Sequence, residues 1–218
     1  MKITKLRFYD GAREKVCRLG LSDIFLEVQE IVIRTEVALL EAQEANGSAV
    51  VRELLDAQFR ASEEWVQTRA GGIDWIKRFR YNKTLLARLG VEIQVSARSD
   101  LLVRDLVHMR NSIQKGHIDA GVIVVPDDRM QRFLVDRTPS YADAVRYIER
   151  EFPEACNFPI VLIAVEHDGP SDTPLPKKKT NTSEGMAIGE NKAEYKARKA
   201  KTQQMDSAEA HTDPLQCH

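Results

Sequence analysis

The class of fold follows from the apolar stretch Ile118-Asp-Ala-Gly-Val-Ile-Val-Val-Pro126. Its run from Val122 to Val125 is uniformly apolar and β-branched, which is typical of a strand buried on both faces of a sheet. Pro126 cannot donate a backbone hydrogen bond and ends the run. A strand that is covered on both faces needs packed elements on each side, so the stretch predicts an α/β fold.

The segments around this strand show helical or strand periodicity. Helices are expected over residues 22–45, 49–66, 101–115 and 141–152, and strands over residues 73–79, 91–95 and 159–165. Their order along the chain is α, α, β, β, α, β, α, β. This order predicts a mixed β-sheet flanked by helices.

Length and composition limit the class of protein. A chain of 218 residues, 43% of them hydrophobic, can form one domain with a substantial core. No apolar run approaches the roughly 20 residues of a membrane span, and the first residues are too polar for a signal peptide. The three cysteines form neither a disulfide framework nor a zinc motif, so we expect a cytoplasmic protein.

The composition changes beyond Asp168, where Pro, Ser, Thr, Lys, Gln and Glu dominate. We therefore expect a single domain over residues 1–186 and a disordered tail over residues 187–218. The formal net charge of −1 gives no global sign of a nucleic-acid partner. Basic residues nevertheless cluster over residues 77–88 and 177–179, either as solvated surface or as contacts to phosphate.

A possible metal site involves two expected strands. Asp74 follows a glycine turn, and Glu92 and Gln94 stand two residues apart, so their side chains leave the same face of the strand. If the strands pair, an aspartate and a glutamate converge, and hard oxygen ligands of this kind suit Mg²⁺. The alternative is a solvated strand edge, because this spacing also occurs by chance.

The chain from about Val50 to Met186 resembles, with gaps, the BamHI/BglII family of type II restriction endonucleases. Gly-Gly-Ile-Asp gives Asp74 and Val-Glu-Ile-Gln-Val-Ser gives Glu92 and Gln94, matching the family's catalytic motif. The resemblance implies a restriction-endonuclease-like core in which Asp74, Glu92 and the Ile93 carbonyl hold the metal. Gln94 would orient the attacking water, because an amide does not accept a proton near neutral pH.

The same resemblance assigns DNA contacts. Arg104 and the adjacent pair Asp136–Arg137 match residues that read bases, and arginine can grip guanine while aspartate accepts from cytosine. Ser183, Glu184 and Gly185 fall on a C-terminal arm that approaches the minor groove. Lys77 or Arg78 would contact phosphate. The alternatives to DNA binding are surface ion pairs and, for the C-terminal arm, a soluble linker.

The chain departs from the family's pattern at two places. A base-reading asparagine of the family falls on Ala97, so we expect the central bases to differ or to be read by Ser96, Arg98 or Ser99. The glutamate that binds a second metal falls near Thr68. Glu53, Glu63 and Glu64 are open as substitutes, and the sequence supports one metal site better than two.

Cutting both strands of a palindrome needs two sites related by a twofold axis, so a homodimer is expected. The resemblance implies an interface of helices 101–115 and 141–152, and we expect Lys115 of one subunit to form an ion pair with Glu149 of the other across it. Core packing within one subunit explains the apolar stripes of these helices equally well. The predicted function is Mg²⁺-dependent cleavage of palindromic double-stranded DNA to 5′-phosphates; the alternatives are a non-specific repair nuclease and a DNA-binding protein with a degenerate site.

Overall fold

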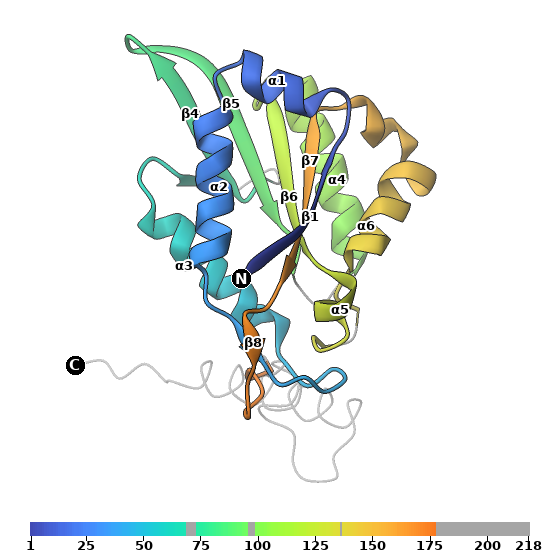
Figure 1. Cartoon of the computed structure of the whole chain (residues 1–218). Helices are drawn as coiled ribbons and strands as arrows, with labels where there is room; N and C mark the ends of the chain where they lie inside the picture. The colour runs from blue at the N-terminus through green and yellow to red at the C-terminus, as the bar shows by residue number, and fades with distance from the viewer. Residues whose placement is uncertain (69–72, 96–98, 136, 178–218) are drawn as a thin grey trace, which may run out of the picture. The chain divides into compact units, whose positions relative to one another are not determined.

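The computed structural model of the chain describes residues 1–68, 73–95, 99–135 and 137–177, and for residues 99–101 only the backbone. Its centre is a six-stranded mixed sheet with the strand order β1-β7-β6-β5-β4-β3 (Figure 1). The strands are β1 (Lys2–Phe8), β3 (Val66–Gln67), β4 (Trp75–Tyr81), β5 (Thr84–Ile93), β6 (Ala120–Pro126) and β7 (Ile160–Glu166). A separate parallel pair joins β2 (Ala38–Leu39) to β8 (Gly169–Pro170).

The buried strand predicted from the sequence is β6, and it lies between two parallel neighbours, β5 and β7. All seven residues of β6 are buried. The outer strands β1 and β4 pair antiparallel to β7 and β5, so the sheet is mixed. The predicted fold class, an α/β fold with a mixed sheet, is therefore confirmed.

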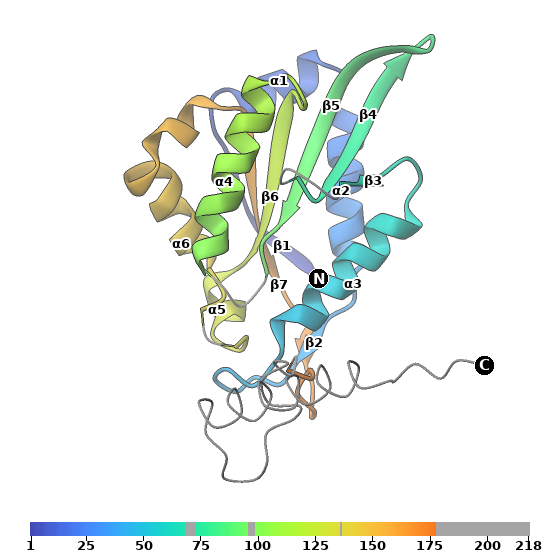
Figure 2. The same cartoon turned by 180° about the vertical axis from the view of Figure 1, so that it is seen from behind.

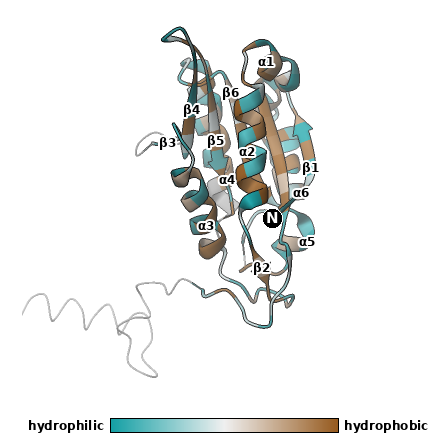
Figure 3. Cartoon of the chain, turned by 60° about the vertical axis from the view of Figure 1, so that its left-hand side comes forward, coloured by the Kyte–Doolittle hydropathy of each residue, from teal (hydrophilic) through white to brown (hydrophobic). Residues whose placement is uncertain are grey.

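Helices cover both faces of the sheet. On one face α1 (Ala12–Arg18), α2 (Ser22–Arg34) and α3 (Ser48–Ala61) pack over a core of apolar side chains. On the other face lie α4 (Ser99–Gln114) and α6 (Tyr141–Arg146), and a π-helical turn, η1 (Tyr147–Glu151), continues α6 (Figure 2). The short elements α5 (Asp128–Gln131) and η2 (Pro153–Asn157) connect these parts. Figure 3 shows that the central strands are hydrophobic and that the helices are amphipathic, with one hydrophobic and one hydrophilic side.

The helix stripes that suggested a dimer interface are explained within one chain. Leu102, Leu106 and Met109 of α4 are fully buried against the sheet, and so is Ile148 of η1. Close packing of α4 on β6 requires Gly121, because a β-carbon there would overlap the Met109 sulfur. The core therefore accounts for these stripes without a second subunit.

Several expected boundaries are wrong. The helix expected over residues 22–45 ends at Arg34, because Thr35 turns into extended backbone and its hydroxyl donates to the Ile31 carbonyl (2.8 Å). The helix expected over residues 49–66 ends at Ala61. The strand expected over residues 91–95 overlaps the end of β5, which begins at Thr84 and ends at Ile93. α6 starts with a capping box between Ser140 and Asp143, and regular α-helix ends at Arg146, not residue 152.

Strand β1 was not predicted because its apolar residues do not alternate. Ile3 and Phe8 both pack against the core on the α2 side, although they are five residues apart. A shift in the register with β7 between Ile3 and Lys5 allows this, as a β-bulge inserts one residue into the ladder. Among the described residues, no helix is both long and apolar enough to cross a bilayer.

Candidate active site

The pairing of β4 with β5 brings Asp74 and Glu92 together. Trp75 pairs with Val91, so Asp74, one residue earlier, faces Glu92, one residue later. One oxygen of Asp74, Oδ2, accepts a hydrogen bond from the Ile93 backbone N–H (2.8 Å). Three residues of the predicted metal site therefore converge as the sequence suggested.

Arg52 of α3 completes this cluster, although no local sequence pattern marks it. Its Nη2 lies 2.7 Å from Asp74 Oδ1, and its Nη1 donates to the Ile93 carbonyl (2.6 Å). Its Nε donates to Asp56 Oδ2 (2.8 Å). Burial opposes the charge on Arg52, but Asp74 and Asp56 outweigh it and raise the pKa of the guanidinium. In an amphipathic helix Arg52 looks like any solvated cation, because only tertiary structure brings it to β5.

Glu92 is the most perturbed group of the site. It is 2% exposed, and its Oε1 is buried without a hydrogen-bond partner. Burial raises the pKa of Glu92 to about 11, helped by the charge of Asp74, a hydrogen bond with Asp74 and the charge of Asp105. A buried oxygen without a hydrogen-bond partner is unfavourable in free energy. Glu92 Oε1 is therefore an oxygen that a bound cation would stabilise.

Gln94 is also buried, and its carboxamide joins β5 to α4. Hydrogen bonding assigns the amide orientation: the nitrogen donates to Asp105 Oδ2 (2.7 Å), and the oxygen accepts from the Leu102 backbone N–H (3.0 Å). Asp105 is 5% exposed. Burial raises the pKa of Asp105 to about 6, against the lowering effect of Arg104 and with the raising effect of Asp74.

Asp105 is a site residue that the sequence analysis missed. The signal was present, because Asp105 lies three residues after Leu102 and four before Met109, on the apolar stripe of α4. A carboxylate in such a stripe needs a polar partner inside the protein. Here that partner is Gln94.

Residues 20–165 match the family model described as restriction endonuclease BglII/BglIII. The match covers more than half of the chain and includes Asp74, Glu92 and Gln94. The chain belongs to the BglII/BglIII restriction endonuclease family. Membership makes it a nuclease that hydrolyses DNA at specific sequences, in a family that typically uses a divalent metal. No curated protein matches the chain.

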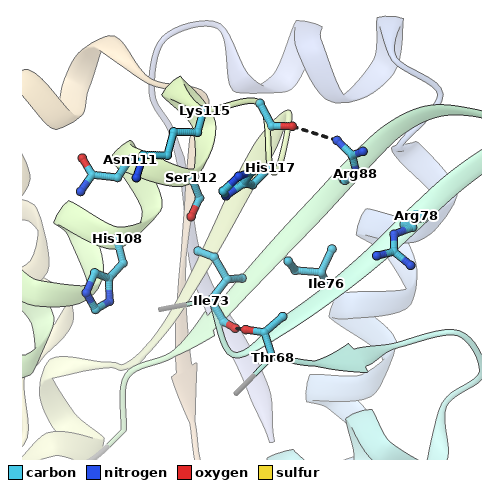
Figure 4. A pocket seen from close by; sticks show the side chains of 11 residues that line it. Thr68, Ile73, Ile76, Arg78, Arg88, His108, Asn111, Ser112, Lys115 and His117 are labelled. Atoms are coloured by element: carbon cyan, nitrogen blue, oxygen red, sulfur yellow. Dashed lines mark hydrogen bonds between the residues drawn. The ribbon is translucent and has the colours of Figure 1, made fainter. Parts of the chain in front are cut away.

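A cavity of about 600 Å³ adjoins the site of this BglII-family nuclease, between α4 and the β4–β5 pair (Figure 4). It is joined to the site by Thr68, whose backbone N–H donates to the Asp74 carbonyl (3.2 Å). The described lining contains the cations Arg78, Arg88 and Lys115 and no carboxylate. The Arg88 guanidinium is held in place by the Gly116 carbonyl (2.8 Å). The cavity therefore presents positive charge along β4 and β5, with Arg78 and Arg88 each four residues along the chain from Asp74 and Glu92.

The residues expected to contact DNA lie in different environments. Arg78 is exposed and lines the cavity. Its neighbour Lys77 points to the other face of β4, where its Nζ contacts Glu27 Oε2 (2.7 Å) and the Glu63 carbonyl (2.9 Å). Arg104 lies exposed on α4, and Arg137 is exposed with a left-handed backbone (φ 71°).

The remaining residues expected to contact DNA lie outside the described part of the chain. Ser99 begins α4, but its side chain is not described. The others outside the described residues are Ser96, Arg98, Asp136, Ser183, Glu184 and Gly185. The same holds for the domain boundary at residue 186 and the tail over residues 187–218.

The two residues expected at a dimer interface have separate surroundings in the single chain. Lys115 is exposed at the rim of the cavity. Glu149 forms an ion pair with Arg7 and accepts a hydrogen bond from the Tyr9 hydroxyl (3.3 Å). A contact between Lys115 and Glu149 of two subunits stays a prediction.

Proposed function

We propose that this family member is a type II restriction endonuclease that hydrolyses phosphodiester bonds in palindromic double-stranded DNA and leaves 5′-phosphates, with Mg²⁺ as cofactor. One observation carries the proposal: Asp74, the Ile93 carbonyl and the buried, unpartnered Glu92 Oε1 converge at the family's motif. Such a set of hard oxygen atoms is what Mg²⁺ binds, together with water and a substrate phosphate.

The residues present fit a single metal ion. Among the described residues, no three His, Cys, Asp or Glu side chains come together in a group that could hold a metal. The proposed metal ligands are therefore two carboxylates and one backbone carbonyl. Asp74, Glu92 and Ile93 would hold it. When bound, the ion supplies Lewis-acid polarisation of the scissile phosphate and activation of a water. A metal charge would also keep Glu92 ionised despite its burial.

The residues of the chain itself position the reaction. We assign Gln94 to orienting the attacking water, with its carboxamide fixed by Asp105 and the Leu102 N–H. Such fixing matters because a catalytic group that is poorly oriented loses much of its effect. Gln94 cannot act as a general base, because an amide is not protonated near neutral pH.

Binding of DNA combines positioning with base reading. Arg78 is assigned to backbone phosphate through the cationic cavity, whereas Lys77 would have to leave Glu27 to do so. Base reading is assigned to Arg104 and to the Asp136–Arg137 pair, with Ser96, Arg98 and Ser99 as further readers. Ser183, Glu184 and Gly185 are assigned to the minor groove. Phosphate contacts carry affinity and base contacts carry specificity.

The protein is proposed to be cytoplasmic and to form a homodimer. A homodimer is expected because one active site cuts one strand and a palindrome has twofold symmetry. The interface is proposed to use the outward sides of α4 and of α6 with η1, since their inward sides are buried in the core. Lys115 with Glu149 of the other subunit is the proposed ion pair across it.

A digestion of unmethylated phage DNA by purified protein tests the proposal. Discrete bands with Mg²⁺ and intact DNA with EDTA are expected, and sequencing the fragment ends gives the site and the 5′-phosphate. A smear would instead indicate a non-specific nuclease. Intact DNA in both reactions, together with a shift in a gel, would indicate a DNA-binding protein with a degenerate site.

A further inference from the structure

Arg52 occupies the same donor atoms that are proposed to hold the metal. Its guanidinium contacts Asp74 Oδ1 at 2.7 Å and the Ile93 carbonyl oxygen at 2.6 Å. Both atoms belong to the proposed donor set. The third donor, Glu92 Oε1, has no hydrogen-bond partner. The guanidinium of Arg52 therefore contacts two of the three oxygen atoms that are proposed to bind the metal.

The position of Arg52 is built into the fold. The side chain is 24% exposed, and its Nε donates to Asp56 one helical turn along α3 (2.8 Å). Asp56 Oδ1 in turn accepts from the indole N–H of Trp75 (2.8 Å), which is buried next to Asp74 on β4. A planar guanidinium with three fixed partners keeps one orientation, unlike a lysine ammonium.

A metal ion and the guanidinium compete for these atoms. Each oxygen has two lone pairs, but a metal ion bound to Asp74 and the Ile93 carbonyl would lie within a few ångströms of the guanidinium, which contacts the same two residues. Two positive charges a few ångströms apart also repel each other in a partly buried site. Metal binding therefore requires Arg52 to withdraw, while its contact with Asp56 can persist.

We propose that Arg52 is the resident counter-ion of the metal-free site and that a divalent metal binds by displacing its guanidinium from Asp74 and Ile93. Arg52 is in this sense a positioning residue: it holds the donor atoms together without metal and weakens metal affinity. The inference rests on the proposed metal-dependent nuclease. It goes further, because it predicts that removal of a cation from the site strengthens metal binding.

The test is a calorimetric titration of Mg²⁺, and separately Ca²⁺, into full-length protein without DNA. R52M should lower the Kd of the metal about tenfold or more relative to the wild type, since it removes both competition and charge repulsion. R52K should fall between the two. R60M removes an exposed arginine from the same helix and should leave the Kd unchanged.

Thermal unfolding separates this role from a merely structural one. In EDTA, R52M should melt below the wild type, and saturating Mg²⁺ should raise its melting temperature more than that of the wild type. If R52M does not fold, R52Q, which keeps polar atoms without the charge, should show the same tightening. An unchanged or higher metal Kd in a folded Arg52 variant overturns the inference.

Different results would overturn the proposed nuclease function. If the wild type binds no divalent metal and leaves phage DNA intact with Mg²⁺, the nuclease proposal fails, and the inference fails with it. If the wild type cuts DNA and binds metal while R52M binds it no more tightly, only the inference fails.

Discussion

The side-chain nitrogen of Gln94 lies 2.7 Å from Asp105 Oδ2, and this contact ties the third residue of the proposed catalytic motif to the helix that follows it. Gln94 is on the segment leaving β5, and Asp105 is within α4. Both side chains are nearly completely buried. The pairing fixes the carboxamide that we assign to the attacking water.

Substitution of Asp105 should therefore slow cleavage without weakening DNA binding. In D105A the Gln94 amide loses its acceptor, and we expect the single-turnover rate to fall about 100-fold, as for other misplaced catalytic groups. D105N retains an oxygen that can accept from Gln94 and should lose less. Equal rates for D105A and the wild type would show that Asp105 does not position Gln94.

The cationic cavity should contribute to affinity independently of sequence. The double variant R78Q/R88Q should weaken binding of all duplexes in Ca²⁺ and reduce the slope of log K against log salt by about two, near one per phosphate contact. R13Q, which removes an exposed arginine from α1, is the matched control. A salt slope equal to that of the wild type would remove the cavity from the DNA interface.

The proposed dimer contact can be tested by exchange of charge. K115E should weaken dimerisation, and the double variant K115E/E149K should restore part of it, as measured by sedimentation equilibrium. The single effect should be about tenfold or less in Kd, because exposed ion pairs contribute little. E149K also breaks the contacts to Arg7 and Tyr9, so the K115E variant is the more informative single change. A monomeric wild type that cuts DNA would contradict the dimer.

Stability should depend on pH through Asp127, which joins β6 to β1. Burial works against ionisation of Asp127, but hydrogen bonds from Thr4 and Lys5 outweigh it and lower the pKa of the carboxyl. A lowered folded-state pKa adds stability above the unfolded value of about 3.9, and this stability is lost as the pH falls through the folded pKa. D127N should cost about 1 kcal/mol at pH 7 in urea unfolding and progressively less below about pH 4. If the difference in unfolding free energy between the wild type and D127N were constant across this pH range, ionised Asp127 would not be the source of the stability.

The sequence predicted those features that depend on local periodicity. The uniformly apolar run at Val122 predicted a strand buried on both faces, and β6 is that strand. The spacing of Asp74, Glu92 and Gln94 required only that two strands pair, and β4 and β5 do pair in the register that brings Asp74 opposite Glu92. Periodicity is sufficient here because neighbouring strands in sequence commonly pair in space.

The features that were missed depend on tertiary contacts. β1 lacks a regular alternation because of its bulge, and its partner β7 lies more than 150 residues away. Arg52 and Asp56 look like an ordinary helix-surface pair four residues apart, until α3 packs beside β4 and β5. No local pattern specifies which charged side chain of a helix will face a strand end.

Asp74 and its neighbours are proposed to form a metal-dependent nuclease site. The most direct measurement compares the wild type with D74N on the same unmethylated DNA, in Mg²⁺ and in EDTA, with DNA binding measured alongside in Ca²⁺. We expect Mg²⁺-dependent discrete fragments from the wild type, and from D74N a cleavage rate lower by about three orders of magnitude with DNA binding retained. Unchanged cutting by D74N, or cutting by the wild type in EDTA, would contradict the assignment.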